Sequence, residues 1–154
     1  MMKRLENKIP PPVITLFFAA IMWGCSFLAP SVEMSLTLRL ILSLVLIVLG
    51  LFFALSGVVS FKKAATTVNP LKPETASLLV TSGVYKYSRN PMYVGLVLLL
   101  LAWNVYLSTP LSLFGIMGFI LYMNRYQIKP EESALTTLFG SEFTTYQAQV
   151  RRWL

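Results

Sequence analysis

Four long apolar runs alternate with polar connectors along the chain. The runs cover residues 13–29, 38–61, 92–107 and 111–126. A helix needs about 20 mostly apolar residues to cross a bilayer, so we expect about four transmembrane helices. The connectors inside the first pair and inside the second pair are short, which predicts two antiparallel hairpins. The predicted fold class is therefore an all-α integral membrane protein, in one domain.

The connector 62–91 is long and polar, and it passes without a break into the third apolar run. Its last residues are Arg89, Asn90 and Pro91. Proline suits the first position of a helix, where its missing N–H would have no partner. Free N–H groups and the helix dipole favour an anion at such a start, and arginine adds a planar, permanently charged fork. This junction is the first candidate site.

The segment 129–154 is too polar to span a membrane. Pro130 followed by Glu131 and Glu132 predicts the start of a helix, and Gly140 predicts its end. Residues 142–150 place apolar side chains at helical spacing, which predicts a second short helix. We therefore expect a cytoplasmic C-terminal helical segment behind the four spans.

The second hairpin brings the two acids to the side of the membrane where Arg89 lies. A basic group and a carboxylate pair at a common mouth suit a zwitterion that carries a carboxylate together with hydroxyl or ammonium groups. S-adenosylmethionine is such a molecule, and nearby tyrosine rings attract its sulfonium. Simpler interpretations stay open: Arg89 as a topology signal, Glu131 and Glu132 as first-turn acids, and the tyrosines as an interfacial belt.

Composition supports a membrane protein. Of the 154 residues, 56% are hydrophobic and 12% are charged, whereas soluble domains carry about 25% charged residues. Mean hydropathy is +0.68. The net charge of +7 comes from basic residues that flank the apolar runs. That distribution predicts both termini in the cytoplasm and membrane lipids, not nucleic acid, as partners.

Several chemistries are excluded by the residues themselves. The chain has no histidine and one cysteine, Cys25, so we expect no metal site and no histidine-based acid or base. It also has no glycine-rich phosphate loop and no Ser-His-Asp set. The candidates that remain are the Arg89 junction and the Glu131–Glu132 pair.

Two ordered motifs resemble the superfamily of isoprenylcysteine carboxyl methyltransferases and phospholipid methyltransferases, and most of all its bacterial branch. The resemblance covers about residue 65 to the C-terminus, and a Thr-Thr-Val-Asn-Pro stretch at 66–70 precedes the first motif. The motifs are Gly83-x-Tyr85-x-x-x-Arg89-Asn90-Pro91-x-Tyr93-x-Gly95, then Pro130-Glu131-Glu132-x-x-Leu135-x-x-x-Phe139-Gly140-x-x-Phe143-x-x-Tyr146, then Val150-Arg151-Arg152-Trp153.

The resemblance implies a membrane methyltransferase that uses S-adenosylmethionine on a lipophilic substrate, in a bacterial inner membrane. It implies catalytic roles for Arg89, Glu131 and Glu132. The residues that it implies for cofactor binding are Gly83, Tyr85, Arg89, Asn90, Pro91, Tyr93, Glu131 and Glu132.

The chain departs from the family pattern at two positions. Asn90 stands where many members have histidine, and Gln127 stands near the place of an arginine that enzymes acting on prenylated cysteine tend to carry. The methyl acceptor therefore stays open among a carboxylate, an amine and a thiol. The alternatives are a nicotinamide-dependent membrane reductase of the related sterol reductase fold, and a non-catalytic membrane scaffold.

Overall fold

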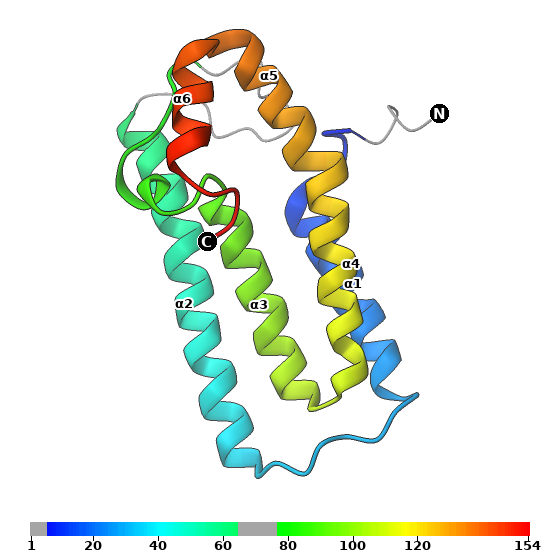
Figure 1. The fold of residues 1–154 in the computed structure, drawn as a ribbon. Helices are drawn as coiled ribbons and strands as arrows, with labels where there is room; N and C mark the ends of the chain where they lie inside the picture. The colour runs from blue at the N-terminus through cyan, green and yellow to red at the C-terminus, as the bar shows by residue number, and fades with distance from the viewer. Residues whose placement is uncertain (1–5, 65–76) are drawn as a thin grey trace.

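The computed structural model describes residues 6–64 and 77–154, and all regular structure within them is helical. The first four helices lie side by side, and the last two fold over one end (Figure 1). We call this end the site end and the opposite one the far end. The helices are α1 (Pro11–Ser26), α2 (Leu36–Lys63), α3 (Pro91–Leu107), α4 (Leu113–Tyr122), α5 (Lys129–Phe139) and α6 (Ser141–Gln149), with the short turns η3 (Gly83–Lys86), η4 (Pro110–Ser112) and η5 (Met123–Ile128).

The helices follow the predicted apolar runs, and the all-α class is confirmed for the described residues. α2, with 28 residues, is long and apolar enough to cross a membrane, whereas α1 and α3 are apolar but shorter. The count of four spans stays a prediction. The stretch 66–70 of the resemblance lies outside the described residues.

The second predicted hairpin is present as α3 and α4, whereas the first is wrong, because α1 and α2 do not pack against each other. α1 packs mainly against α3 and α4, and α2 packs against α3, so α3 lies between the first two helices. The connection from α1 to α2 crosses the far end, where the Val32 N–H donates to the Ser108 carbonyl at 2.7 Å and the Ser108 hydroxyl donates to the Val32 carbonyl at 2.8 Å. These bonds hold the connection against the end of α3, so that α2 packs on the other side of α3 from α1.

Glycines allow α2 and α3 to approach each other closely. A Cβ added to Gly95 would lie 2.6 Å from the carbonyl oxygen of Gly50, and one added to Gly50 would lie 2.9 Å from the carbonyl oxygen of Gly95. Small residues bring membrane helices into close contact in this way. On the other side, Gly115 and Gly118 of α4 face Met22 and Phe18 of α1, so small residues also allow close contact between these two helices.

The helix predicted to start at Pro130 has no start there. α4, η5 and α5 form one continuous helix from Leu113 to Phe139, and its middle portion, η5, has π-helical geometry. Pro130 has no N–H to give to the carbonyl of Tyr126, four residues earlier. The Asn7 N–H takes that place at 3.0 Å. An outside donor and a loosened turn therefore let the helix pass through proline, and Glu131 and Glu132 are carried rigidly on the extension of α4.

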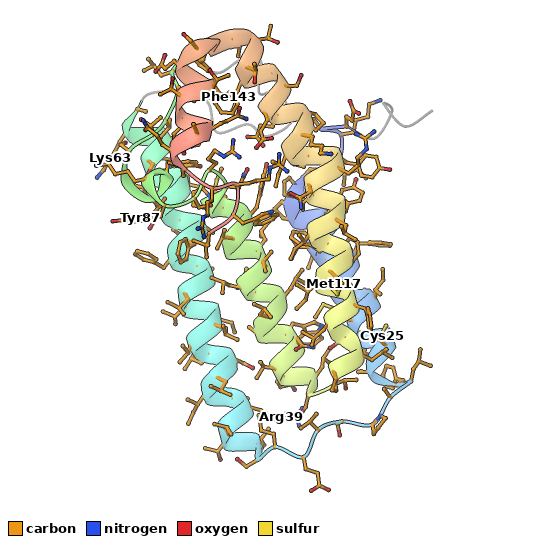
Figure 2. All side chains as sticks on the ribbon, in the orientation of Figure 1. Cys25, Arg39, Lys63, Tyr87, Met117 and Phe143 are labelled. Atoms are coloured by element: carbon orange, nitrogen blue, oxygen red, sulfur yellow. The ribbon has the colours of Figure 1, made fainter. Side chains whose placement is uncertain are left out.

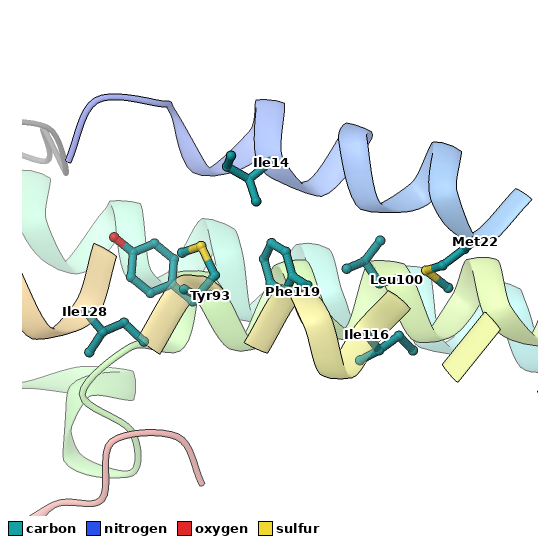
Figure 3. Close-up of a cluster of buried hydrophobic side chains, with 8 residues drawn as sticks. Ile14, Met22, Tyr93, Leu100, Ile116, Phe119 and Ile128 are labelled. Carbon is teal, nitrogen blue, oxygen red and sulfur yellow. The ribbon is translucent and has the colours of Figure 1, made fainter. Parts of the chain in front are cut away.

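Two apolar clusters hold the structure together. The larger one joins α1, α3 and α4, and it includes the fully buried Phe119 and Met123 (Figure 3). The smaller one lies under α6, where Phe143 and Tyr146 meet Tyr85. Gly140, with φ of +51°, ends α5 as predicted, and the predicted second short helix is α6.

Arg39 lies at the far end, away from α5 and α6 (Figure 2). Its Nε donates to the Tyr106 carbonyl at 3.1 Å, and its guanidinium carbon lies 5.8 Å from the centre of the Tyr106 ring. The charge thus serves the carbonyl end of α3, where the helix dipole favours a cation.

Candidate active site

The site is built at the start of α3, where the chain enters the helix through Asn90 and Pro91. Both are buried. The Asn90 carbonyl accepts the N–H groups of Tyr93 and Val94, and the Asn90 N–H donates to the Ser88 hydroxyl at 3.1 Å. Its side-chain amide does not cap the helix but donates to the Arg152 carbonyl at 2.8 Å. Asn90 therefore joins the first turn of α3 to the C-terminal segment.

Arg89 points at Glu132, on the extension of α4. Its Nη2 lies 3.3 Å from the Glu132 carboxylate, and the two side chains are only 12% and 14% exposed. The Nε and Nη1 atoms of Arg89 are buried and have no hydrogen-bond partner among the described residues. A buried donor without a partner costs about 1–3 kcal/mol, so this arginine has spare capacity for an anionic ligand.

Arg152 is a site residue to which no role was given from the sequence. It donates from Nε and Nη2 to the two Glu132 oxygens at 3.0 and 2.6 Å, a two-bond pair. Glu132 is thus shared between two guanidiniums, which leaves the group with one net positive charge. The only sequence signal was the Val-Arg-Arg-Trp stretch of the resemblance, in which nothing distinguishes Arg152 from Arg151.

The C-terminal residues close the site by their backbone as well. The Arg89 N–H donates to the Arg151 carbonyl at 3.0 Å, and the Trp153 indole N–H donates to the Asn124 side chain at 3.1 Å. Together with the Asn90 bond, these contacts tie the C-terminal segment to α3 on one side and to η5 on the other. The site is therefore enclosed by three segments that are distant in sequence.

Glu131 has a different partner from its neighbour. The Tyr93 hydroxyl, on a side chain only 4% exposed, donates to the Glu131 Oε2 at 3.1 Å. Burial raises the pKa of Glu131 to about 7, against a lowering by the Tyr93 hydrogen bond and a further rise from the adjacent Glu132 charge. One acid of the pair is thus paired with cations, and the other is held by a neutral hydroxyl.

Gly83 and Tyr85 lie beside this group rather than in it. Gly83 has φ of +63° at the start of η3, a conformation that glycine adopts without strain. Tyr85 is packed in the smaller cluster, and its carbonyl accepts the Tyr146 hydroxyl at 2.6 Å. Burial raises the pKa of Tyr85, and the Glu131 charge raises it further. In the structure, Gly83 and Tyr85 belong to the loop on which α6 packs. Their part in cofactor binding stays a prediction.

Removing the Tyr146 hydroxyl tests how much this seat contributes. In Tyr146→Phe the buried Tyr85 carbonyl loses its side-chain donor, which is expected to cost about 1–2 kcal/mol of folding stability. Thermal unfolding in detergent should show a lower midpoint. Tyr87→Phe is the matched control, because the Tyr87 side chain is 74% exposed. Equal midpoints for the two variants would show that α6 does not depend on this bond.

Comparison with known proteins identifies the family. A model of the phospholipid methyltransferase family matches residues 38–142, from the start of α2 to the start of α6. The protein-S-isoprenylcysteine O-methyltransferase of Saccharomyces cerevisiae is 30% identical over 130 residues, which is 81% of this chain and 54% of that protein. The Schizosaccharomyces pombe protein of the same name is 30% identical over 104 residues, which is 66% of this chain and 43% of that protein.

The chain spans about half the length of these curated relatives. No solved structure matches it. The family match includes the Arg89 junction and both acids, and it begins well before residue 65, where the resemblance in the sequence begins. The superfamily predicted from the motifs is thereby confirmed. This chain belongs to the phospholipid methyltransferase family.

Proposed function

We propose that the protein is a membrane methyltransferase that transfers a methyl group from S-adenosylmethionine to a carboxylate, amine or thiol of a lipophilic acceptor. The observation that carries the proposal is the partly buried ionic group of Arg89, Glu132 and Arg152 at the start of α3, in a family of methyltransferases. The names of the yeast relatives, which are O-methyltransferases, support the same reaction type.

The residues present fit such a donor molecule. Its carboxylate would find the unpartnered Nε and Nη1 of Arg89, and the surplus positive charge would attract it. Glu131 and Glu132 offer acceptors for its ammonium or hydroxyl groups. When bound, the donor supplies a methyl group already activated by the sulfonium. The protein has to align an acceptor with it and exclude water.

We expect the methyl acceptor to reach the site from the membrane. α2 is long and apolar enough to span a bilayer. Apart from Arg39 at the far end, the described basic residues lie at or beyond the site ends of the helices, before α1, at the end of α2, around η3, on η5 and α5, and in the C-terminal segment. By the positive-inside rule, the site end faces the cytoplasm. A lipophilic acceptor would present its polar group at the site end while its hydrocarbon chain stays between the helices.

Transfer of label tests the proposal. The protein in lipid nanodiscs is given S-adenosylmethionine with a labelled methyl group and a bacterial lipid extract. We expect label in an organic-soluble product. The amount of product should fall at least about tenfold with Arg89→Ala. It should be unchanged with Lys86→Ala, which removes a positive charge of the same sign from an exposed position three residues earlier. A wild-type protein that leaves all label on the donor, in every lipid mixture, would rule the proposal out.

A further inference from the structure

The two neighbouring acids, Glu131 and Glu132, are held in opposite electrostatic environments. Glu132 takes both arginines of the site, with contacts of 3.3 Å to Arg89 and 2.6 Å to Arg152. Glu131, one residue earlier, faces the Tyr93 hydroxyl of α3. Such an arrangement pairs Glu132 with two cations, but it gives Glu131 none. Two acids side by side in sequence are therefore expected to perform different tasks.

The groups around Glu131 favour uptake of a proton. From α3 it meets Tyr93, and its nearest charge on α5 is the negative Glu132. Tyr85 of η3 carries a pKa that the Glu131 charge raises, so these two groups also sense each other. Both guanidiniums of the site are engaged by Glu132. With burial as the largest cause, the pKa of Glu131 lies at about 7, where a carboxylate exchanges protons near neutral pH.

We propose that Glu131, positioned by the Tyr93 hydroxyl, accepts the proton that a protonated acceptor gives up on methylation. The inference rests on the proposed function and narrows its acceptor to a group whose reacting atom carries a proton, an ammonium or a thiol. A carboxylate acceptor is already ionised and needs no such partner. In this role Glu131 contacts the methyl acceptor in addition to the donor, and Tyr93 is a positioning residue.

The step balances without any further reactant. An ammonium passes one proton to the ionised Glu131 and becomes a neutral amine. The amine lone pair forms the new N–C bond as the S–C bond of the donor breaks, and the bonding pair returns to sulfur, which ends as a thioether. The product is a methylated ammonium, and Glu131 returns its proton to water. For a thiol, the same transfer yields the thiolate, and an S–C bond forms in place of the N–C bond.

The pH dependence of kcat tests this role, measured in nanodiscs with saturating dodecylamine, dodecanethiol or dodecanoate. With a protonated acceptor, kcat should fall about tenfold per pH unit below about 7, as ionised Glu131 is lost. In Tyr93→Phe the bond that lowers the pKa of Glu131 is gone, so this limb should move to higher pH. Tyr122→Phe, an exchange of a tyrosine on α4, is the control and should leave it in place. The acceptor's own titration is the same in all three proteins and cancels in the comparison.

A second measurement needs no activity. A carboxyl group with a pKa raised by folding weakens the fold as pH rises from about 4.5 to 7, because only the unfolded chain ionises freely there. Glu131→Gln should therefore melt at a higher temperature than wild type at pH 8, with a smaller difference at pH 5. Glu142→Gln, on the exposed face of α6, should show no such dependence.

The outcomes separate the two proposals. Transfer only to dodecanoate, or a pH limb that Tyr93→Phe leaves unchanged, would overturn the proton role while the methyltransferase stands. A Glu131→Gln melting difference that is the same at pH 5 and pH 8 would also overturn it. Absence of transfer to every probe, with no binding of the donor, would overturn the proposed function, and the acceptor role with it.

Discussion

Replacing Arg89 by alanine is expected to weaken the binding of S-adenosylhomocysteine by about tenfold to a hundredfold, since one charged hydrogen-bonding partner contributes about 1.5–3 kcal/mol. The arginine brings two unpartnered buried donors to the site and half of the cationic pair around Glu132. Methyl transfer should fall at least as far, because a loosely held donor is also poorly aligned with the acceptor.

The Arg89→Ala protein is expected to stay folded. Glu132 keeps its two-bond pair with Arg152, so the substitution leaves no buried carboxylate without a partner. The backbone bond from residue 89 to the Arg151 carbonyl also survives, since it does not involve the side chain. Calorimetric titration and thermal unfolding should be run on the same samples, with Lys86→Ala as control. If Arg89→Ala bound S-adenosylhomocysteine with wild-type affinity, Arg89 would not be part of the binding site.

Gly95→Ala is expected to show the largest loss of stability. Its added methyl group would lie 2.6 Å from the Gly50 carbonyl oxygen and 2.9 Å from the Ala54 nitrogen, both backbone atoms of α2. Backbone atoms inside a helix cannot step aside, so α2 and α3 must separate. Overpacking of this kind costs about 1–3 kcal/mol, more than the gain of up to about 1 kcal/mol from replacing glycine inside a helix.

Gly24→Ala is the matched control, because a Cβ there meets nothing within 4 Å. It keeps the helix-propensity gain without the clash, so its thermal midpoint should equal or exceed that of wild type, while that of Gly95→Ala falls. Since α3 begins with the site residues, Gly95→Ala should also reduce methyl transfer. Equal midpoints for the two variants would show that α2 and α3 can separate without cost.

The long apolar runs were enough to predict the helices, because each run can place its apolar side chains in apolar surroundings as one helix. The two halves of the site were also predictable. Arg89 and Glu132 lie on opposite sides of a short turn between antiparallel helices, and such a turn returns the chain to the end from which it started. Their contact at 3.3 Å follows from that topology.

The remaining features depend on contacts between distant segments. Pro130 looks like a helix start, and only the Asn7 N–H on the Tyr126 carbonyl explains why the helix continues through it. In the sequence, Arg152 is one of several basic residues in a polar C-terminal segment. Its role follows only from its contacts with Asn90 and Glu132 in the structure. The close approach of Gly50 and Gly95 could not be predicted from the sequence either, because a single glycine is common in an apolar helix.

The most direct test of the central claim changes the ligand and the protein together. S-adenosylhomocysteine and its decarboxylated analogue are titrated into wild type, Arg89→Ala and Lys86→Ala. We expect wild type and Lys86→Ala to bind the carboxylate-bearing ligand at least about tenfold more tightly than the analogue. Arg89→Ala should bind the two ligands equally, since it already lacks the guanidinium that pairs with the ligand carboxylate. Failure of wild type to bind S-adenosylhomocysteine, or the same preference in Arg89→Ala, would contradict the account.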